Sequence, residues 1–285
     1  MGLLQEGVTE FNVPLRFLLT GPLNVGLLER TLNTVIERQE ALRTHFVEQE
    51  GELLQIVSPA LKLSLEVEDI GHWPVERKDA QAAMLCHTQT GQAFRLDTGP
   101  LIRAALVRLG PSSHWLHITV HQAIFDGGSA TVLMEEIAAI YQAFFEGSFC
   151  PLEALPLQFG DCSAWQNQFL KSPEMQRQLV WWKQRLQGMS ELDLPTEFSR
   201  PADKSWKCDS ASVLLPRALT DRLDAIAAKN GATPAQLHFA AYNILLHRYT
   251  GSTDIAVCTP TTGRNWVIVR NDLAGIPPFG KFLGQ

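Results

Sequence analysis

The sequence predicts an α/β fold, because stretches with the alternation of a strand recur between stretches with the apolar spacing of a helix. The clearest example starts with the alternating stretch His114–His121, which is followed by the turn residues Asp126-Gly127-Gly128. Apolar residues then recur at helical spacing from Thr131 to Phe145. The composition agrees, since 45% of the 285 residues are hydrophobic and 19% are charged, as in globular proteins with a sizeable core.

The N-terminal part begins with an apolar strand at Asn12–Thr20, which Gly21-Pro22 ends. Asn24 is a good helix cap, and the apolar residues that follow it recur at helical spacing as far as Arg38. The pattern then predicts short strands near Thr44–Gln49, Leu53–Val57 and Leu61–Glu66, and a helix over Val75–Thr90.

The middle of the chain predicts a hairpin, in which Leu101–Leu109 pairs with His114–His121 through a short turn. After the helix that ends at Phe145, prolines mark a linker over residues 147–156. The remaining pattern predicts two helices within residues 157–187 that separate at Ser172-Pro173, a strand at Ala211–Leu215, and helices at Thr220–Asn230 and Pro234–Arg248.

Composition excludes several classes of function. A net charge of −6 offers no electrostatic footprint for nucleic acid or an anionic membrane. No apolar run reaches the roughly 20 residues of a membrane helix, and the N-terminus lacks the pattern of a secretion signal. The five cysteines are odd in number and without C-x-x-C spacing, which argues against a disulfide framework or a zinc site and favours a reducing cytoplasm. The histidines have no ligand-like spacing, so we expect no metal site.

The turn after the central strand carries a motif. Residues His121 to Gly127 read H-Q-A-I-F-D-G, which resembles the H-H-x-x-x-D-G motif of nonribosomal peptide synthetase condensation domains. The resemblance implies that His121 and Asp126 shape the site and that Gly127 lies beside the reacting thioester. The catalytic second histidine of that family is replaced here by Gln122.

Other stretches resemble the same family in the same order, from Phe11 to Arg264. Residues 38–46 resemble its R-H-E-x-L-R-T-x-F motif, with Gln39 where a histidine is usual. The resemblance makes Arg38 or Arg43 the candidate counter-ion of Asp126. Further matches lie at residues 94–101, 156–165, 181–186, 194–201 and 249–264.

The resemblance implies the two-lobed α/β fold of the chloramphenicol acetyltransferase-like superfamily, with the motif loop in a tunnel between the lobes. We expect a nearly complete first lobe at residues 1–187, a linker at 188–207 and a partial second lobe at 208–285. His117 shares a strand face with His121, so it is a candidate to line the tunnel, although a core histidine is the simpler interpretation. Ser129 is the other candidate, with a helix cap as its simpler role.

By resemblance the function is amide-bond formation between thioesters tethered to peptidyl or acyl carrier protein domains, within a line of neighbouring synthetase modules. No bound cofactor is implied, because the phosphopantetheine belongs to the carriers. Gln122 leaves three interpretations open: a slow domain that works by positioning, a domain that no longer condenses and serves as a docking, recruitment or relic module, or an introduced substitution that traps a state.

A rival interpretation uses the other histidine. His121 and Asp126 also form the H-x-x-x-x-D pattern of glycerolipid acyltransferases, in which the two side chains would activate a hydroxyl group. Two residues at one spacing are weak evidence, and nothing else in the sequence resembles that family.

Overall fold

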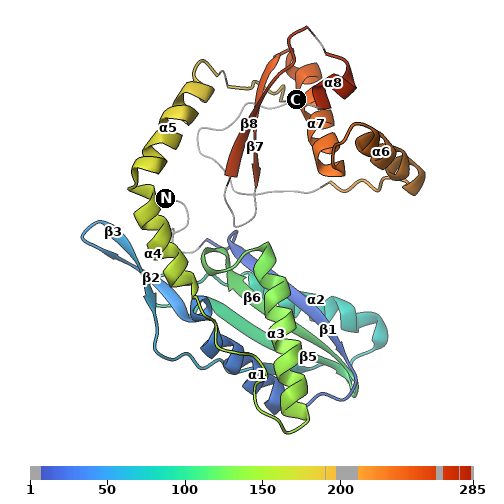
Figure 1. The fold of residues 1–285 in the computed structure, drawn as a ribbon. Helices are drawn as coiled ribbons and strands as arrows, with labels where there is room; N and C mark the ends of the chain where they lie inside the picture. Colours follow the sequence, from blue (N-terminus) through green and yellow to red (C-terminus); the bar gives the residue numbers. More distant parts are fainter. Residues whose placement is uncertain (1–7, 190, 197–210, 261–265, 276, 284–285) are drawn as a thin grey trace. The chain divides into compact units, whose positions relative to one another are not determined.

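The computed structural model describes residues 8–189, 191–196, 211–260, 266–275 and 277–283. The chain divides into two compact units, Met1–Ser172 and Pro173–Gln285 (Figure 1). We describe each unit by itself. The division at Ser172 lies within the expected first lobe, residues 1–187, and the expected lobe boundaries stay a prediction.

The first unit is built on a four-stranded sheet with the order β1-β6-β5-β4. All neighbours in this sheet are antiparallel except β4 and β5, which are parallel. The strands of this sheet are β1 (Asn12–Thr20), β4 (Glu66–Asp69), β5 (Ile102–Gly110) and β6 (Ser113–His121). A separate hairpin consists of β2 (Thr44–Gln49) and β3 (Glu52–Val57), with the single turn η2 (Glu40–Arg43) before it. The predicted β5–β6 hairpin is confirmed.

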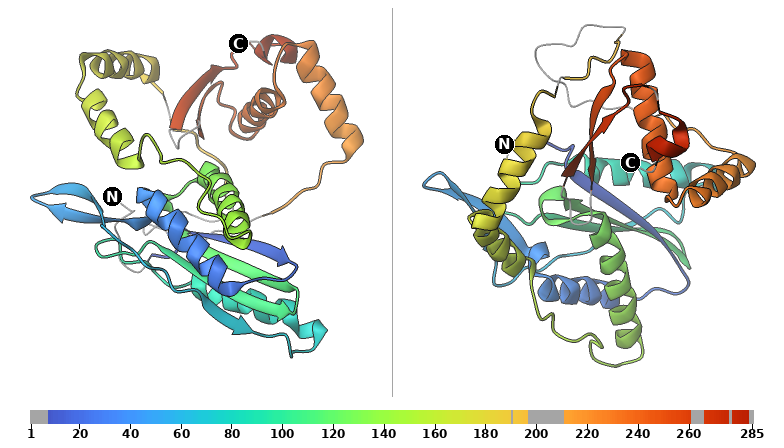
Figure 2. Two further views of the ribbon diagram at one scale, coloured as in Figure 1. Left: turned by 60° about the horizontal axis from the view of Figure 1, so that its bottom comes forward. Right: turned by 45° about the horizontal axis from the view of Figure 1, so that its top comes forward.

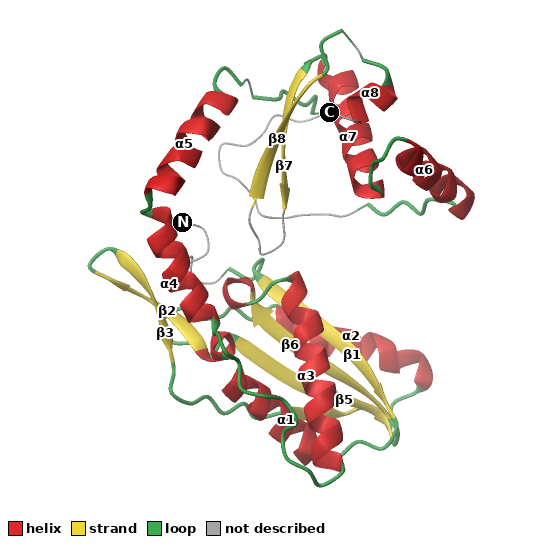
Figure 3. Cartoon of the chain, viewed as in Figure 1, coloured by secondary structure: helices red, strands yellow, loops and turns green. Residues whose placement is uncertain are grey.

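Helices cover both faces of this sheet. Helices α1 (Val25–Arg38) and α3 (Gly127–Phe145) lie over one face, and α2 (Val75–Thr90) lies over the other (Figures 1 and 3). Figure 2 shows the same arrangement from two further directions, with the blue helix α1 and the cyan helix α2 on opposite sides of the sheet. The main core lies between the sheet and the α1–α3 pair, where the alternate β6 residues Leu116, Ile118 and Val120 are fully buried.

Helix α1 forms where the sequence predicts it. The side chain of Asn24 accepts a hydrogen bond from the Leu27 amide at 3.1 Å and so caps the helix. Leu28, Leu32 and Val35 then fall on one face and are buried, which ties the helix to the sheet through apolar contact. Helix α2 has the predicted bounds, and α4 (Phe159–Leu170) follows the predicted linker.

The predicted strand at Leu61–Glu66 is mostly wrong. Only Glu66 joins β4, and the preceding residues form no strand. The backbone of this segment bonds to side chains of α1 instead: the Leu63 amide donates to Asn33 at 2.8 Å and the Leu65 amide donates to Glu29 at 3.0 Å. The apolar alternation that suggested a strand therefore reflects the burial of Leu63 and Leu65 against the core.

The second unit contains helices and a hairpin. Its elements are α5 (Pro173–Leu186), α6 (Arg217–Lys229), α7 (Pro234–Thr250), β7 (Asp254–Pro260), β8 (Trp266–Asp272) and α8 (Phe279–Leu283). Strands β7 and β8 pair antiparallel. Arg270 on β8 binds Asp254 on β7 and donates to the carbonyls of Arg185 and Gln187, so α5 is attached to this unit at its C-terminal end.

The predicted strand at Ala211–Leu215 is also wrong. This segment has irregular structure, and Val213 and Leu214 are 84% and 94% exposed. A strand needs a neighbour to satisfy its backbone, and among the described residues this segment pairs with none. Strand β8 was not predicted from the sequence at all.

Candidate active site

The backbone fixes the motif loop where β6 ends. The amide of His121 donates to the carbonyl of Leu101 at 2.9 Å, and the next amide, that of Gln122, donates to the carbonyl of Phe11 at 2.8 Å. These two bonds leave in opposite directions, one toward β5 and the other toward the residue before β1. The first residues of the motif are therefore held from both sides.

The His121 side chain stabilises the turn. Its Nδ1 accepts a hydrogen bond from the Ala123 amide at 3.1 Å, which caps the short turn η3 (Gln122–Ile124). The ring is only 2% exposed and lies edge-on to the rings of Phe11 and Phe94, with centroid distances of 6.1 Å to each. Because this bond needs a lone pair on Nδ1, the neutral ring carries its proton on Nε2.

Gln122 and Gly127 form the exposed part of the motif. Both residues are exposed, whereas His121, Ile124 and Phe125 are buried. A Cβ atom added at Gly127 would have no neighbour within 4 Å among the described residues, so within this part of the chain open space adjoins its backbone. A ligand can therefore approach the main chain at Gly127, on the same loop as the exposed glutamine.

Asp126 is the cap of helix α3. Among its contacts, Oδ1 accepts from the Ser129 amide at 2.8 Å and from the Ser129 hydroxyl at 2.6 Å. The Asp126 amide donates to the Ser129 Oγ at 3.2 Å, which completes a capping box. Ser129 thus has the helix-cap role that its position suggested, and its place in a tunnel stays a prediction.

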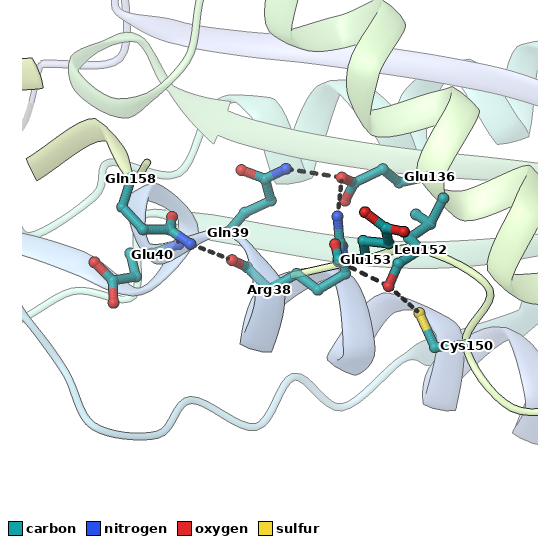
Figure 4. Close-up of polar contacts among 8 residues, drawn as sticks. All are labelled: Arg38, Gln39, Glu40, Glu136, Cys150, Leu152, Glu153 and Gln158. Carbon is teal, nitrogen blue, oxygen red and sulfur yellow. Dashed lines mark hydrogen bonds and ion pairs between the residues drawn. The ribbon is translucent and has the colours of Figure 1, made fainter. Parts of the chain in front are cut away.

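The two arginines of the second motif bind other carboxylates. Arg38 lies 3.2 Å from Glu136 (Figure 4). Arg43 lies 3.3 Å from Glu40 and donates to the Ser58 carbonyl. These contacts give no support to an ion pair between either arginine and Asp126.

Glu136, in the middle of α3, joins this helix to the end of α1, and sequence reasoning missed it. The residue is 8% exposed, and its Oε1 accepts from Arg38 at 3.2 Å and from the Gln39 amide group at 2.9 Å (Figure 4). Gln158 adds a second link, since it donates to the Arg38 carbonyl and accepts from the Glu40 amide. The available signal was a glutamate at helical spacing from the apolar residues Leu133 and Ile140, which places a charge on the apolar face of α3. The cluster fixes the positions of α1, α3 and the start of α4 relative to one another, so it supports the helix that begins at the motif.

His117 lies four residues before His121 on β6, on the same face of the strand. It is 2% exposed, and its Nε2 lies 3.2 Å from the Thr90 hydroxyl and 3.1 Å from the Thr119 hydroxyl. Burial, with a smaller effect from Arg16, lowers the pKa of His117 below its usual value, so the ring is neutral at pH 7. It lines a cavity between α2 and the β4–β5 edge, and its predicted place in an inter-lobe tunnel stays a prediction.

Among the described residues there is no group of three or more histidine, cysteine, aspartate or glutamate side chains that could hold a metal ion. In the described part of the chain no helix is both long enough and apolar enough to cross a membrane. Cys86, Cys150, Cys162 and Cys258 are free thiols, and Cys208 lies outside the described residues.

The chain matches a known protein family over most of its length. The family model described as the condensation domain matches residues 1–274. The chain belongs to the condensation-domain family. A linear gramicidin synthase of Brevibacillus parabrevis is 34% identical over 96% of this chain, and bacitracin synthase 2 of Bacillus licheniformis is 32% identical over 99%. The resemblance predicted from the motifs is confirmed.

Solved structures show the same fold. The X-domain from teicoplanin biosynthesis is 27% identical with a TM-score of 0.85, and the match covers 99% of this chain and 65% of that one. The first condensation domain of the calcium-dependent antibiotic synthetase has a TM-score of 0.79 at 23% identity and shows likeness of fold alone. This condensation-domain chain spans only 4% of the gramicidin synthase and 10% of bacitracin synthase 2.

We predict that Asp126 acts on stability mainly as a helix cap. Asp126→Ala should lower the free energy of unfolding by about 0.5–2 kcal/mol, because the Ser129 amide loses its acceptor. Asp126→Asn keeps an Oδ1 acceptor and should recover most of that loss in a urea titration followed by circular dichroism. Equal losses in the two variants would show that the carboxylate charge matters more than the cap.

We also predict a pH dependence from His117. The folded state binds this proton less tightly than the unfolded chain, whose histidines titrate near pH 6.5. Stability should therefore be complete above about pH 6.5 and should fall as the pH drops through that value toward the lowered pKa of the folded state. Buried His114, whose pKa burial also lowers, acts in the same direction.

Urea titrations between pH 7.5 and 5 test this. His117→Gln should reduce the slope of stability against pH, whereas the control His87→Gln, at an exposed position on α2, should leave the slope unchanged. An unchanged slope in His117→Gln would contradict the account.

Proposed function

We propose that this chain is a condensation domain that joins two carrier-tethered aminoacyl or peptidyl thioesters through an amide bond, by positioning and without an imidazole base. The observation that carries this proposal is the exposure of Gln122 at a turn whose backbone is held by Phe11 and Leu101. The His121 ring is buried, and its Nδ1 accepts the hydrogen bond from the Ala123 amide within the turn. The neighbouring position 122 faces solvent, and its side chain there is the amide of a glutamine.

Gln122 limits the chemistry in a defined way. Amide formation requires the acceptor amine to be placed on the donor carbonyl and its proton to be removed. A glutamine side chain donates and accepts hydrogen bonds but does not take up a proton near neutral pH. Loss of a general base typically lowers the rate by about 10²- to 10⁴-fold, while orientation and polarisation by a fixed loop persist.

The partners follow from the substrates. The thioesters would arrive on phosphopantetheine arms of peptidyl or acyl carrier protein domains, so the pantetheine enters as part of the substrate. The open space beside Gly127 supports this proposal, because a thioester needs to come close to the main chain there. Neighbouring synthetase modules would supply the donor and the acceptor.

A second function is favoured by one comparison. A second structure of the X-domain from teicoplanin biosynthesis shows it in a complex with OxyB, and it matches this chain at 27% identity with a TM-score of 0.82. A chain with the same fold and Gln122 in the motif could likewise serve to recruit another protein rather than to condense substrates. The two functions differ in whether any product forms.

We expect Gln122→His to form dipeptide on the carrier at least about tenfold faster than the native chain, because a base is supplied at a position that already faces the substrates. Donor and acceptor groups are loaded on carrier proteins, and product is followed by intact-protein mass spectrometry. Gln166→His, at an exposed position on α4, is the matched control and should leave the rate unchanged.

The outcomes separate the two functions. Product from the native chain above the control without enzyme supports positioning by the loop. Absence of product from both the native chain and Gln122→His, with carrier binding retained, would reject the condensation proposal and favour recruitment.

A further inference from the structure

A cavity of about 450 Å³ lies inside the first unit, away from the motif loop. Its walls are the C-terminal half of α2, residues 61–68 and the edge of β5, and His117 reaches it from β6. No residue from His121 to Gly127 lines it. Its volume is in the range of small-molecule sites.

The cavity lies where the sheet is incomplete. Strand β4 pairs with β5 only from Ala105 to Arg108. The segment before β4 turns its backbone to α1, where it bonds to Asn33 and Glu29. No backbone hydrogen bond in the described chain joins Leu61–Leu65 to β5. Within the described residues, part of the β5 edge therefore lacks a neighbouring strand.

The register shows which peptide groups face this edge. The Leu101 carbonyl accepts from His121 on β6, and the Arg108 carbonyl accepts from Ile70 on the opposite side. Because backbone groups of alternate residues point to opposite edges, those of Ile102 and Ala104 point away from β6. Their amides face the cavity side, where residues 61–65 provide no ladder partner.

Side chains around the cavity also have unsatisfied polar atoms. Gln89 Oε1, Arg103 Nε and His117 Nδ1 have almost no accessible surface and no hydrogen-bond partner in the described protein, so a ligand would reach them through a small side-chain movement. All three residues line the cavity. Buried polar atoms are normally hydrogen-bonded, so a cavity that gathers an acceptor, a donor and an imidazole nitrogen is suited to a ligand with both kinds of group.

The rest of the lining suits an apolar, uncharged body. The positive charges of Lys62 and Arg103 are balanced by the negative charges of Glu66 and Glu68. The apolar part of the wall includes Leu61, Val67, Leu85, Ala105 and Val107. His117 is neutral at pH 7 because burial lowers its pKa, so it adds no charge.

We propose that this cavity binds a short, uncharged peptide, or a small molecule with peptide-like amides, in an extended conformation along the free edge of β5. Its carbonyl groups would accept from the amides of Ile102 and Ala104, and its N–H groups would donate to Gln89. An open edge of about three residues has room for two or three ligand residues. The site does not depend on the proposed condensation function, since the motif loop takes no part in it.

The test uses two matched probes with the 285-residue chain. The first is N-acetyl-valyl-valine N-methylamide, and the second is its ester analogue, in which an oxygen replaces the central N–H. Ligand-observed NMR titration should show saturable binding of the amide and about fivefold weaker binding of the ester, because one donated hydrogen bond is lost. Absence of saturable amide binding, or equal binding of both probes, would overturn the proposal.

Variants locate the binding. Ala105→Leu should abolish it by filling the cavity, whereas Ala83→Leu, at an exposed position on α2 outside the lining, should leave it unchanged. Gln89→Leu should weaken binding about fivefold and serves as the decisive variant if Ala105→Leu does not fold. Unchanged binding in Gln89→Leu and in folded Ala105→Leu would place the probe elsewhere and overturn the assignment.

Discussion

The candidate active site depends on the pairing of β6 along both of its edges. From Ser113 to His121 this strand is bonded to β1 on one side, and almost all of it is bonded to β5 on the other. Its end cannot shift without breaking two ladders, and the layers of α1 and α3 on one face and α2 on the other hold the sheet in place. The motif loop inherits this rigidity, because its first two amides continue the same bonding pattern.

This constraint gives most polar residues of the motif a structural role. His121 caps a short turn, Asp126 caps α3, and Ser129 completes the capping box. Gln122 and Gly127 stay exposed. The part of Gln122 that is known to hold the loop is its backbone amide, which donates to the Phe11 carbonyl, so a change of side chain at position 122 keeps this contact and alters the chemistry that the loop presents.

Local features of the first unit were predictable from the sequence. Helix α2 and the β5–β6 hairpin formed as predicted, since turn residues and periodicity act over a few neighbours. The strand predicted at Leu61–Glu66 was wrong because apolar alternation indicates only which residues are buried. It does not show whether the backbone bonds to a strand or to side chains of α1. Strand β8 forms by pairing with β7, whereas the segment before α6 has no strand partner among the described residues. No local pattern specifies either outcome.

The same limit applies to the site. The order of the motifs identified the loop, but the contacts of Arg38 and Gln39 with Glu136 join residues 98 and 97 positions apart in the chain. A sequence pattern names the groups that need partners and does not choose among distant carboxylates. The buried glutamate in α3 was a signal that a cation or an amide had to meet it.

The protonation of His121 tests the central claim most directly, because the claim is that this ring serves the turn through Nδ1. Long-range ¹H–¹⁵N correlation spectra at pH 8 distinguish the two neutral tautomers of each histidine, and His121→Gln assigns the signal. We predict that His121 carries its proton on Nε2, with Nδ1 as the acceptor of the Ala123 amide. A proton on Nδ1 would contradict the account, since the turn would then lack its cap.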